Sequence, residues 1–412
     1  MAKVSRKDNK GYVLHLGESQ RKSDGRYCYS YTDRQGDRHY IYASTLVELR
    51  KREKELEKSR MDGLDPFAAD RLTINDMFDR YMSQKFDLKP TTRSNYLYTY
   101  DHIVRNGFGK SKLSSIKFTD VKKYYNELLT ERGLSPATVD NIHTLLHPAF
   151  QLAIREEILR MNPTDGVMAE IKKSKIWVKN KRHALTIPQQ RNLLNFIEEN
   201  PELSGWYPIV MVLLGTGMRI GECLGLRWED IDFDKRIINV THTLSDRPVG
   251  ENRKCERHIL EPKTEAGTRV IPMLDEVMDA FLQEYQIQKC LGFCKEEIDG
   301  YSGFIFSTAQ GTLYQASAVN QALHRMQKAY NDMETERAKK EKREPELMPD
   351  FSAHHLRHTF CTRLCENETN IKVIQEIMGH RDIQTTMDIY AEATVEKKQE
   401  VMSSLQGKII IR

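Results

Sequence analysis

The chain has 412 residues, 39% of them hydrophobic and 30% charged, and its formal net charge is +4. This length predicts two or three domains, and the composition is that of a soluble protein with a well-formed core. No apolar run approaches the roughly 20 residues of a membrane span, and no apolar region of a secretory signal follows the N-terminus. Seven cysteines without a Cys-x-x-Cys pair disfavour a zinc site and favour reduced, buried thiols in a cytosolic protein.

The charge is unevenly distributed along the chain. Residues 1–62 contain 15 Lys and Arg against 10 Asp and Glu, and residues 71–182 contain 20 against 12. Since residues 63–70 carry −2, the net charge of residues 183–412 is −7. The basic N-terminal part can bind a polyanion such as nucleic acid, and a basic surface that is merely solvated is the alternative.

The first 62 residues have the pattern of a small sheet followed by a helix. We predict strands at Gly11–Leu16, Arg26–Tyr31 and Arg38–Tyr42, a turn at Asp33–Asp37 and a helix that ends near Ser59. Tyr27, Tyr29 and Tyr31 alternate with small residues, which is the period of a half-buried strand. Thr45 and Glu48 have the spacing of a capping box, which marks the start of the helix.

Residues 72–165 have a helical pattern. Three helix starts are marked by capping residues or proline, namely Thr73, Pro90 and Ser135-Pro136. Apolar residues recur at helical spacing over residues 139–154, and we expect Asn162-Pro163 to end this last helix. A lysine-rich linker follows at Lys172–Arg182.

Residues 183–412 form the largest predicted domain. We expect helices at 187–199, 206–216, 219–227, 274–290 and 316–335, and strands at Arg236–Thr243, His258–Lys263 and Arg269–Ile271. The highly charged stretch 333–347 is predicted to be a solvated helix end or loop, and no function is assigned to it.

Two basic residues of this domain lie where a chain can approach a phosphate. Arg219 follows two glycines that allow close approach, and Glu222, one helical turn further on, can orient its guanidinium. Lys263 precedes the turn of a predicted β-hairpin, from which a lysine can enter a DNA groove and donate a proton to a leaving oxygen. The alternatives are a surface ion pair and a lysine that is only solvated.

A second basic cluster, His354–His358, lies on another predicted helix. A spacing of three places His354 and Arg357 on one face, where Arg357 can bind a phosphate bidentately and His354 can hydrogen-bond a non-bridging oxygen. His358 is better explained as a structural histidine. We discount a metal site because no carboxylate or cysteine completes the ligand shell and the arginine would repel a cation.

The last candidate residues are His380 and Tyr390. Gly379 is predicted to end a helix and to leave His380 free to point into a site. Tyr390 is expected to follow a short helix that starts near Ile383, and a tyrosine in the core is the alternative. A phenol with an ordinary pKa of about 10 attacks at neutral pH only if cations surround the phosphate and a base receives the proton.

In this order the residues resemble those of the tyrosine recombinases, the phage integrase family. The matching series is Arg219, Lys263, His354-x-x-Arg357, His380 and Tyr390, and the neighbouring residues Thr216–Leu224, His354–Phe360 and Met378–His380 agree with it. Gly17–Tyr27 and Glu297–Ser302 are similar to integrases of conjugative transposons from Gram-positive bacteria. The resemblance spans essentially the whole chain, and His355 is a mild departure at a position that is often a small polar residue.

The resemblance implies a role for each of these residues. The scissile phosphate would be bound by Arg219, His354, Arg357 and His380, with Lys263 as the general acid for the 5′ oxygen, Glu222 as a supporting residue and Tyr390 as the nucleophile. The intermediate would be a 3′-phosphotyrosyl bond, which a free 5′-hydroxyl reverses. No metal, ATP or other cofactor would be needed.

The resemblance also implies a mixed α/β, multi-domain architecture. It assigns residues 1–62 to an arm-site DNA-binding domain with a three-stranded sheet and a helix, residues 72–170 to a helical, SAM-like core-binding domain, and residues 183–412 to a mainly α catalytic domain with a small antiparallel sheet and a C-terminal tail. Candidate DNA contacts on the N-terminal sheet are Arg21, Lys22, Arg26 and Arg38.

The implied partners are double-stranded DNA at the element ends and accessory arm sites, further copies in a homotetramer, an excisionase and a host DNA-bending protein. No membrane is expected, and the implied location is the bacterial cytoplasm, in association with the nucleoid. The chain ends in the β-like segment Lys408–Arg412, which we expect to dock on a neighbouring protomer rather than on its own domain.

Site-specific recombination that excises and integrates a mobile element is therefore the predicted function. A DNA-binding regulatory or architectural protein on the same fold is the alternative, and the complete set of six catalytic groups argues against it. A type IB topoisomerase shares the chemistry, but the N-terminal sheet and helix favour a sequence-specific integrase.

Overall fold

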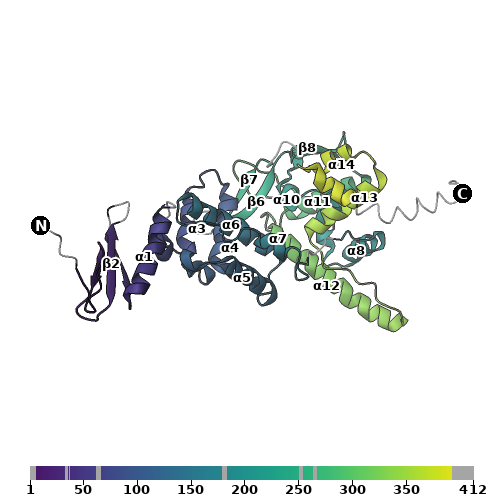
Figure 1. Cartoon of the computed structure of the whole chain (residues 1–412). Coiled ribbons are helices and arrows are strands. Elements are labelled where there is room, and N and C mark those ends of the chain that lie inside the picture. Colours follow the sequence, from purple (N-terminus) through teal and green to yellow (C-terminus); the bar gives the residue numbers. More distant parts are fainter. Residues whose placement is uncertain are drawn as a thin grey trace, which may run out of the picture. The chain divides into compact units, whose positions relative to one another are not determined.

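The computed structural model describes residues 6–32, 36, 38–61, 66–178, 183–249, 254–262 and 267–391 (Figure 1). The chain divides into two compact units, residues 1–179 and 180–412. Within the described ranges, no helix combines the length and the apolar character needed to cross a membrane.

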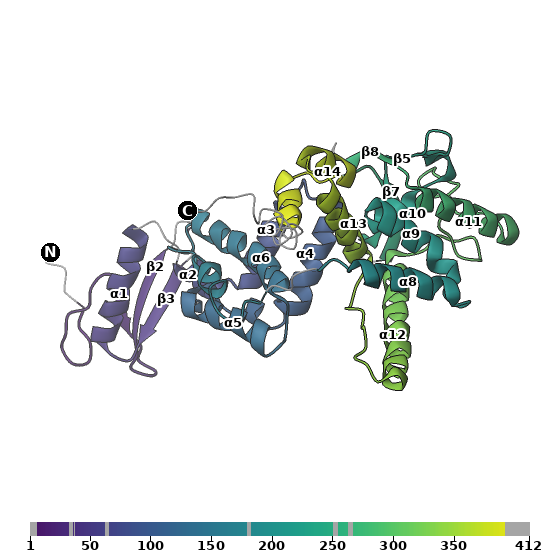
Figure 2. The same cartoon turned by 90° about the vertical axis from the view of Figure 1, so that its right-hand side faces the viewer.

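The N-terminal part of the first unit is a three-stranded antiparallel sheet with one helix. Its elements in chain order are β1 (Glu18–Gln20), β2 (Tyr27–Thr32), β3 (Arg38–Ala43) and α1 (Leu46–Met61). The helix packs on β2 and β3 (Figure 2), where Tyr27, Ala43 and Leu49 are buried. The Thr45 hydroxyl accepts a hydrogen bond from the backbone of Glu48, as the predicted helix start requires.

The second and third predicted strands are confirmed, but the strand predicted at Gly11–Leu16 is wrong. The first strand is β1, and residues 11–16 instead turn back on the segment before them. Leu14 donates a backbone hydrogen bond to Arg6, and Val13 forms an isolated bridge with Lys7. The predicted turn at Asp33–Asp37 is described only at Gly36, whose φ of 95° is the positive value expected there.

A helical bundle forms the rest of the first unit. Its elements are α2 (Pro66–Arg71), α3 (Ile74–Ser83), α4 (Pro90–Ile103), η1 (Phe108–Lys110), η2 (Leu113–Ser115), α5 (Phe118–Thr130), α6 (Pro136–Arg155) and α7 (Val167–Ile171). Thr73 and Ser135 accept capping hydrogen bonds, and proline begins α4 and α6, as predicted. The last long helix ends before Asn162-Pro163, because Glu157 adopts a positive φ of 59° and Ile158 bonds back to Ala153.

The second unit is mainly helical and contains two small antiparallel sheets. Its labelled helices are α8 (Ile187–Glu199), η3 (Ser204–Trp206), α9 (Tyr207–Thr216), α10 (Ile220–Gly225), η4 (Trp228–Asp230), α11 (Asp275–Leu291), α12 (Ala316–Glu341), α13 (Ala353–Asn367) and α14 (Ile371–Met378), and residues 383–391 form a further helix. Its strands are β4 (Ile231–Asp232), β5 (Ile237–Val240), β6 (Thr243–Val249), β7 (Lys254–Leu260) and β8 (Arg269–Pro272). The apolar helix α9 is buried along its length, and α8, α10, α11 and α13 pack on it.

The strand order corrects the predicted hairpin around Lys263. The described strands form one sheet in the order β4-β5-β8 and a separate pair, β6-β7. Since β7 and β8 belong to different sheets, these two strands do not pair as the predicted hairpin, and residues 263–266 between them lie outside the described residues. The reason is burial, since Ile238 of β5 and Ile271 of β8 face each other in the ladder and both lie in the core.

The charged stretch 333–347 is only partly solvated. Helix α12 runs on to Glu341, further than predicted, and the chain then folds back on it. Buried Glu334 accepts hydrogen bonds from Arg343 and from the backbone of Glu346. These contacts hold residues 343–346 against α12, so part of the charged stretch has a structural role.

Candidate active site

The site begins at the corner between α9 and α10. Gly217 ends α9 with a φ of 61°, and a Cβ there would lie 2.4 Å from the ring of Phe360. Arg219 then caps α10: its backbone N–H donates to Glu222 Oε2 over 2.9 Å, and its Nη1 donates to Oε1 over 2.6 Å. The Glu222 side chain is 4% exposed and that of Arg219 is 44% exposed, so the carboxylate is internal while the arginine reaches the surface.

Arg357 lies on α13 and reaches the same corner from the other side. Its Nη1 donates to the Gly217 carbonyl over 2.7 Å, and its Nη2 donates to the Met378 carbonyl over 2.6 Å. The residue is only 4% exposed. Burial, followed by the charge of Arg219, lowers the pKa of Arg357 to about 9. Because its carbonyl partners are neutral, they do not cancel the positive charge of this buried guanidinium, which can therefore attract an anion.

The histidines near Arg357 divide into two kinds. His354 is exposed near the start of α13. His355 accepts a hydrogen bond from the Ser352 backbone N–H, which makes it part of the capping box of this helix. This capping bond gives His355 a structural position and explains why a histidine is tolerated there.

His380 follows the end of α14. As predicted, Gly379 ends the helix with a φ of 63°. The His380 ring is 7% exposed, and its Nδ1 lies 2.9 Å from the hydroxyl of Thr386. Burial, with the charges of Arg357 and Arg219, lowers the pKa of His380 to about 4, so the ring is neutral at pH 7.

Tyr390 lies inside the helix of residues 383–391, near its end, and does not follow that helix as predicted. The ring is half-buried and packs on a small apolar cluster that contains Cys361, Ile374 and Met378. Thr386, the partner of His380, lies one helical turn before Tyr390 on the same helix. The helix that carries Tyr390 thus also carries the hydrogen-bond partner of His380.

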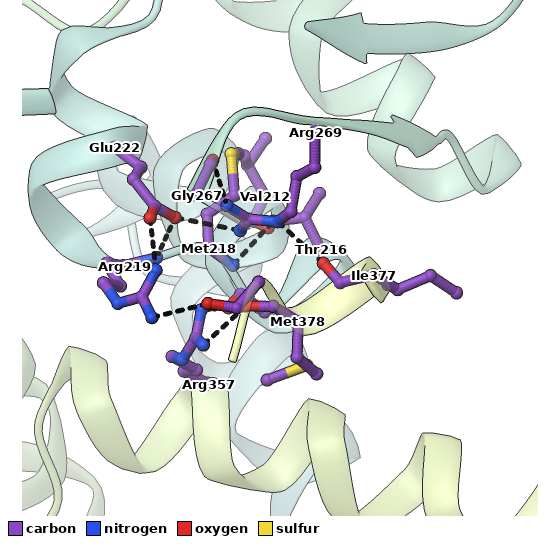
Figure 3. A network of polar contacts seen from close by, with 12 residues as sticks. Val212, Thr216, Met218, Arg219, Glu222, Gly267, Arg269, Arg357, Ile377 and Met378 are labelled. Atoms are coloured by element: carbon purple, nitrogen blue, oxygen red, sulfur yellow. Dashed lines mark hydrogen bonds and ion pairs between the residues drawn. The ribbon is translucent and has the colours of Figure 1, made fainter. Parts of the chain in front are cut away.

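Arg269 was missed by the sequence analysis and lies at the centre of this network (Figure 3). It begins β8, it is 5% exposed, and its Nη2 donates to Glu222 Oε2 over 2.9 Å. Its Nε donates to the Ile377 carbonyl over 2.7 Å. Local sequence carries little signal for this role, since an arginine at the start of a strand ordinarily reaches solvent.

Three arginines therefore bind three successive carbonyls at the end of α14. Arg269 binds the carbonyl of residue 377, Arg357 that of residue 378 and Arg219 that of residue 379, the last over 2.9 Å (Figure 3). Burial alone would raise the pKa of Glu222, but Arg269 and then Arg219 hold it below its ordinary value. The carboxylate is therefore ionised between two guanidiniums, and it fixes both.

Lys263 lies outside the described residues, so its place relative to this network stays a prediction. The described residues around it, Pro262 and Gly267, are close together: a Cβ on Gly267 would lie 2.4 Å from the Cβ of Pro262. Arg269 Nη1 also donates to the Gly267 carbonyl over 3.2 Å. The two ends of the connection that carries Lys263 therefore meet beside Arg269.

The N-terminal sheet exposes a second candidate surface. Arg21, Lys22, Arg26 and Arg38 are all exposed, as expected for DNA contacts. The guanidinium of Arg21 lies 5.5 Å from the ring centre of Tyr42, and that of Arg38 lies 5.8 Å from that of Tyr40. Both tyrosines are exposed, and neither was among the predicted DNA contacts. Arginines that rest on aromatic rings are held in place at a surface that can meet DNA.

One group of side chains in the described ranges has the spacing of a metal site, His15, Glu18 and Glu53. Arg50 donates to both carboxylate oxygens of Glu18, over 2.9 and 3.1 Å. A cation would have to compete with this guanidinium for the same oxygens, so the group is better explained as an ion pair.

Comparison with known proteins gives matches along the chain. Residues 183–397 match the model of the phage integrase family, residues 2–60 that of the DNA binding domain of Tn916 integrase, and residues 73–129 that of the N-terminal SAM-like domain of phage integrases. The chain is 32% identical to the transposase from transposon Tn916 of Enterococcus faecalis, over 97% of this chain and 96% of the relative. The same values hold for the transposase from Tn1545 of Streptococcus agalactiae.

Solved structures agree with these matches. The integrase of transposon Tn1549, solved in complex with transposon right end DNA, is 30% identical, with a TM-score of 0.69. The match covers 81% of this chain and all of that one. A lambda integrase dimer on a core site shares the fold at 18% identity, with a TM-score of 0.53 and 92% and 95% of the two chains covered. The chain belongs to the phage integrase family, and it is a DNA breaking-rejoining enzyme of the tyrosine recombinase type.

Proposed function

We propose that this protein is a site-specific recombinase that excises and integrates a transposon through a bond between DNA and Tyr390. The observation that carries the proposal is the arrangement at the end of α14. Arg219 and Arg357 converge there on neighbouring carbonyls, and His380 follows directly. Positive charge around one point, beside a helix that carries a tyrosine, is what attack on a phosphodiester requires.

In the proposed reaction, the Tyr390 hydroxyl gives its proton to a base, for which exposed His354 is the candidate, and its oxygen attacks the phosphorus atom of the scissile phosphate. The bond from phosphorus to the 5′ oxygen breaks, and Lys263 gives that oxygen a proton. The 3′ phosphate remains attached to the tyrosine, and a 5′-hydroxyl from the partner strand reverses the step. Since one phosphoester replaces another, the bond energy is retained and no ATP is needed.

The described residues divide the work of binding the phosphate. Arg219 and Arg357 each use two nitrogens for protein contacts, and because a guanidinium has five N–H groups, others remain for phosphate oxygens. Neutral His380 would donate from Nε2, and exposed His354 would approach a non-bridging oxygen. Glu222 would keep Arg219 in place. Stabilisation of the developing charge by such preorganised donors is the largest expected catalytic contribution.

We assign residues 1–62 to accessory arm sites and residues 72–170 and 183–412 to the crossover site. The family models matched in each part support this division. A homotetramer on DNA is proposed because a lambda integrase tetramer has been solved on a Holliday junction.

An excisionase and a host DNA-bending protein would set the direction of recombination. The protein would act at the nucleoid in the cytoplasm. The proposed docking of Lys408–Arg412 on a neighbour concerns residues outside the described ranges.

A nicked suicide duplex that carries one element end tests the proposal. When the strand breaks, the short fragment beside the nick diffuses away, so the covalent protein–DNA product accumulates. We expect this product from the wild type and none from Tyr390→Phe. Absence of product from the wild type on both element ends would contradict the enzyme assignment and leave the regulatory DNA-binding protein. Relaxation of plasmids that lack the site would favour a topoisomerase instead.

A further inference from the structure

We infer that Arg269 is a positioning residue for strand cleavage, acting through Glu222 on the phosphate-binding Arg219. The inference rests on the proposed function and adds a residue to it. We expect no direct contact of Arg269 with DNA, because its side chain is 5% exposed and its donors are directed at the protein. Its effect on the reaction must therefore pass through the groups it holds.

The first of these groups is the Glu222 carboxylate, whose oxygens are divided between two arginines. Oε1 accepts from Arg219 Nη1 over 2.6 Å, and Oε2 accepts from Arg269 Nη2 over 2.9 Å. If Arg269 were removed, the full charge of a buried carboxylate would be left to Arg219. That arginine would then be held more tightly by Glu222 and would be less available to a phosphate.

The second group is the end of α14, which sets the position of His380 because this residue follows directly. A helix ends with carbonyls that have no partner inside the helix and carry partial negative charge. Arg269 satisfies the carbonyl of residue 377, and Arg357 and Arg219 satisfy the next two. Loss of Arg269 would remove the side-chain donor to the Ile377 carbonyl and allow the helix end, with His380, to shift relative to Arg357.

Methionine is a suitable replacement because it keeps the length and apolar stem of arginine but no charge. Arg269→Met should form the covalent product roughly 100-fold more slowly in a single turnover at saturating protein, the usual cost of a small misplacement at a reacting centre. Affinity for the crossover DNA should stay near that of the wild type. Arg269→Lys should recover part of the rate, since it restores the charge opposite Glu222 but cannot also bind Ile377.

Arg227→Met is the matched control. Arg227 follows the other end of α10, is mostly buried, and pairs with the buried carboxylate of Asp230. Its loss should lower the melting temperature without a comparable loss of cleavage rate. If both variants lose rate in proportion to stability, Arg269 is merely structural and the inference fails. If Arg269→Met does not fold, the comparison of Arg269→Lys with the wild type decides in the same way.

A double-mutant cycle identifies the route. If Arg269 acts through Glu222, then Arg269→Met combined with Glu222→Gln should cost much less than the product of the two single effects. Multiplicative effects would overturn the inference.

A DNA with sulfur as the bridging 5′ atom gives a second test, since a thiolate leaves without a proton donor. On this DNA, Lys263→Ala should recover its cleavage rate, whereas Arg269→Met should not. Recovery of the rate by Arg269→Met would show that Arg269 assists departure of the leaving group.

The outcomes separate the inference from the function on which it rests. No covalent product from the wild type contradicts the recombinase itself. If the wild type and Arg269→Met form covalent product at the same rate, only the proposed role of Arg269 is contradicted.

Discussion

Two regions of this protein hold arginine side chains in opposite ways. On the N-terminal sheet, Arg21 and Arg26 have side chains that are 49% and 63% exposed and pair loosely with Asp24. In the second unit, Arg357 is 4% exposed and Arg269 is 5% exposed, and both bind backbone carbonyls over short distances. The same residue type is an exposed surface charge in one place and an internal group fixed by carbonyls in the other.

We expect the difference to correspond to two tasks, DNA binding at the sheet and catalysis in the second unit. A surface arginine gains affinity for DNA mainly by releasing counterions, so its contribution depends on salt and tolerates small changes of position. A catalytic arginine must already point at the charge that develops in the transition state, so it is fixed in advance at the cost of desolvation. The lowered pKa of Arg357, about 9, reflects that cost. Four variants should make this contrast sharper or break it.

The largest effect is expected for Tyr390→Phe. The ring and its packing on the apolar cluster of Cys361, Cys365, Ile374 and Met378 remain, while the nucleophilic oxygen is lost. Covalent product should disappear, while DNA affinity and melting temperature stay near those of the wild type. Gel electrophoresis of denatured product, together with a binding titration, measures both. Persistent covalent product would move the nucleophile to another residue.

The second effect is expected for Arg357→Lys. Lysine keeps the charge but cannot bridge the carbonyls of Gly217 and Met378, which the two ends of the guanidinium reach. Cleavage should slow by about 10²–10³-fold, as for the loss of one preorganised donor. Single-turnover rates at saturating protein measure this. A rate near that of the wild type would show that charge suffices and that the bridged geometry is unimportant.

The third effect is a pH dependence of stability caused by His380. Its pKa is lowered from 6.5 to about 4, so below pH 6.5 the unfolded chain binds a proton that the folded chain does not. The free energy of unfolding should therefore fall as the pH drops from about 6.5 to 4. His380→Gln should have a shallower slope in this window. His143 has the same direction of shift, so the difference between the two proteins, measured by denaturant titration, is the relevant quantity. Equal slopes would contradict the buried, neutral state of His380.

The smallest effect is expected for Arg38→Ala on the sheet. Binding to an accessory-site duplex should weaken modestly, and the slope of log K against log salt should become shallower by about one if the contact is to a phosphate. Cleavage of a crossover duplex without accessory sites should be unchanged. An unchanged salt slope with altered preference at one base pair would instead assign Arg38 to base recognition.

Much of the fold was predictable because its signals are local. The capping residues Thr73 and Ser135 mark helix starts in the sequence and in the structure, and Gly379 ends its helix as predicted. The errors have a common cause. Residues 11–16 and the connection around Lys263 were assigned from alternation and turn residues, but strand pairing depends on which distant edge is available.

The candidate site divides in the same way. Arg219, Arg357 and His380 were recognisable from the residues beside them, and they meet at one helix end. Arg269 was not recognisable, because its role depends on Glu222 and Ile377, which are 47 and 108 residues away in sequence.

The sequence by itself determined most of the helices, the family and the series of candidate reactive groups, because these depend on residue types at short spacing. Only the tertiary structure decided which arginine is buried, which is exposed, and how one carboxylate and three successive carbonyls are shared among them. The physical reason is that a buried charge is stable only where distant segments bring it partners, and no local pattern specifies that meeting.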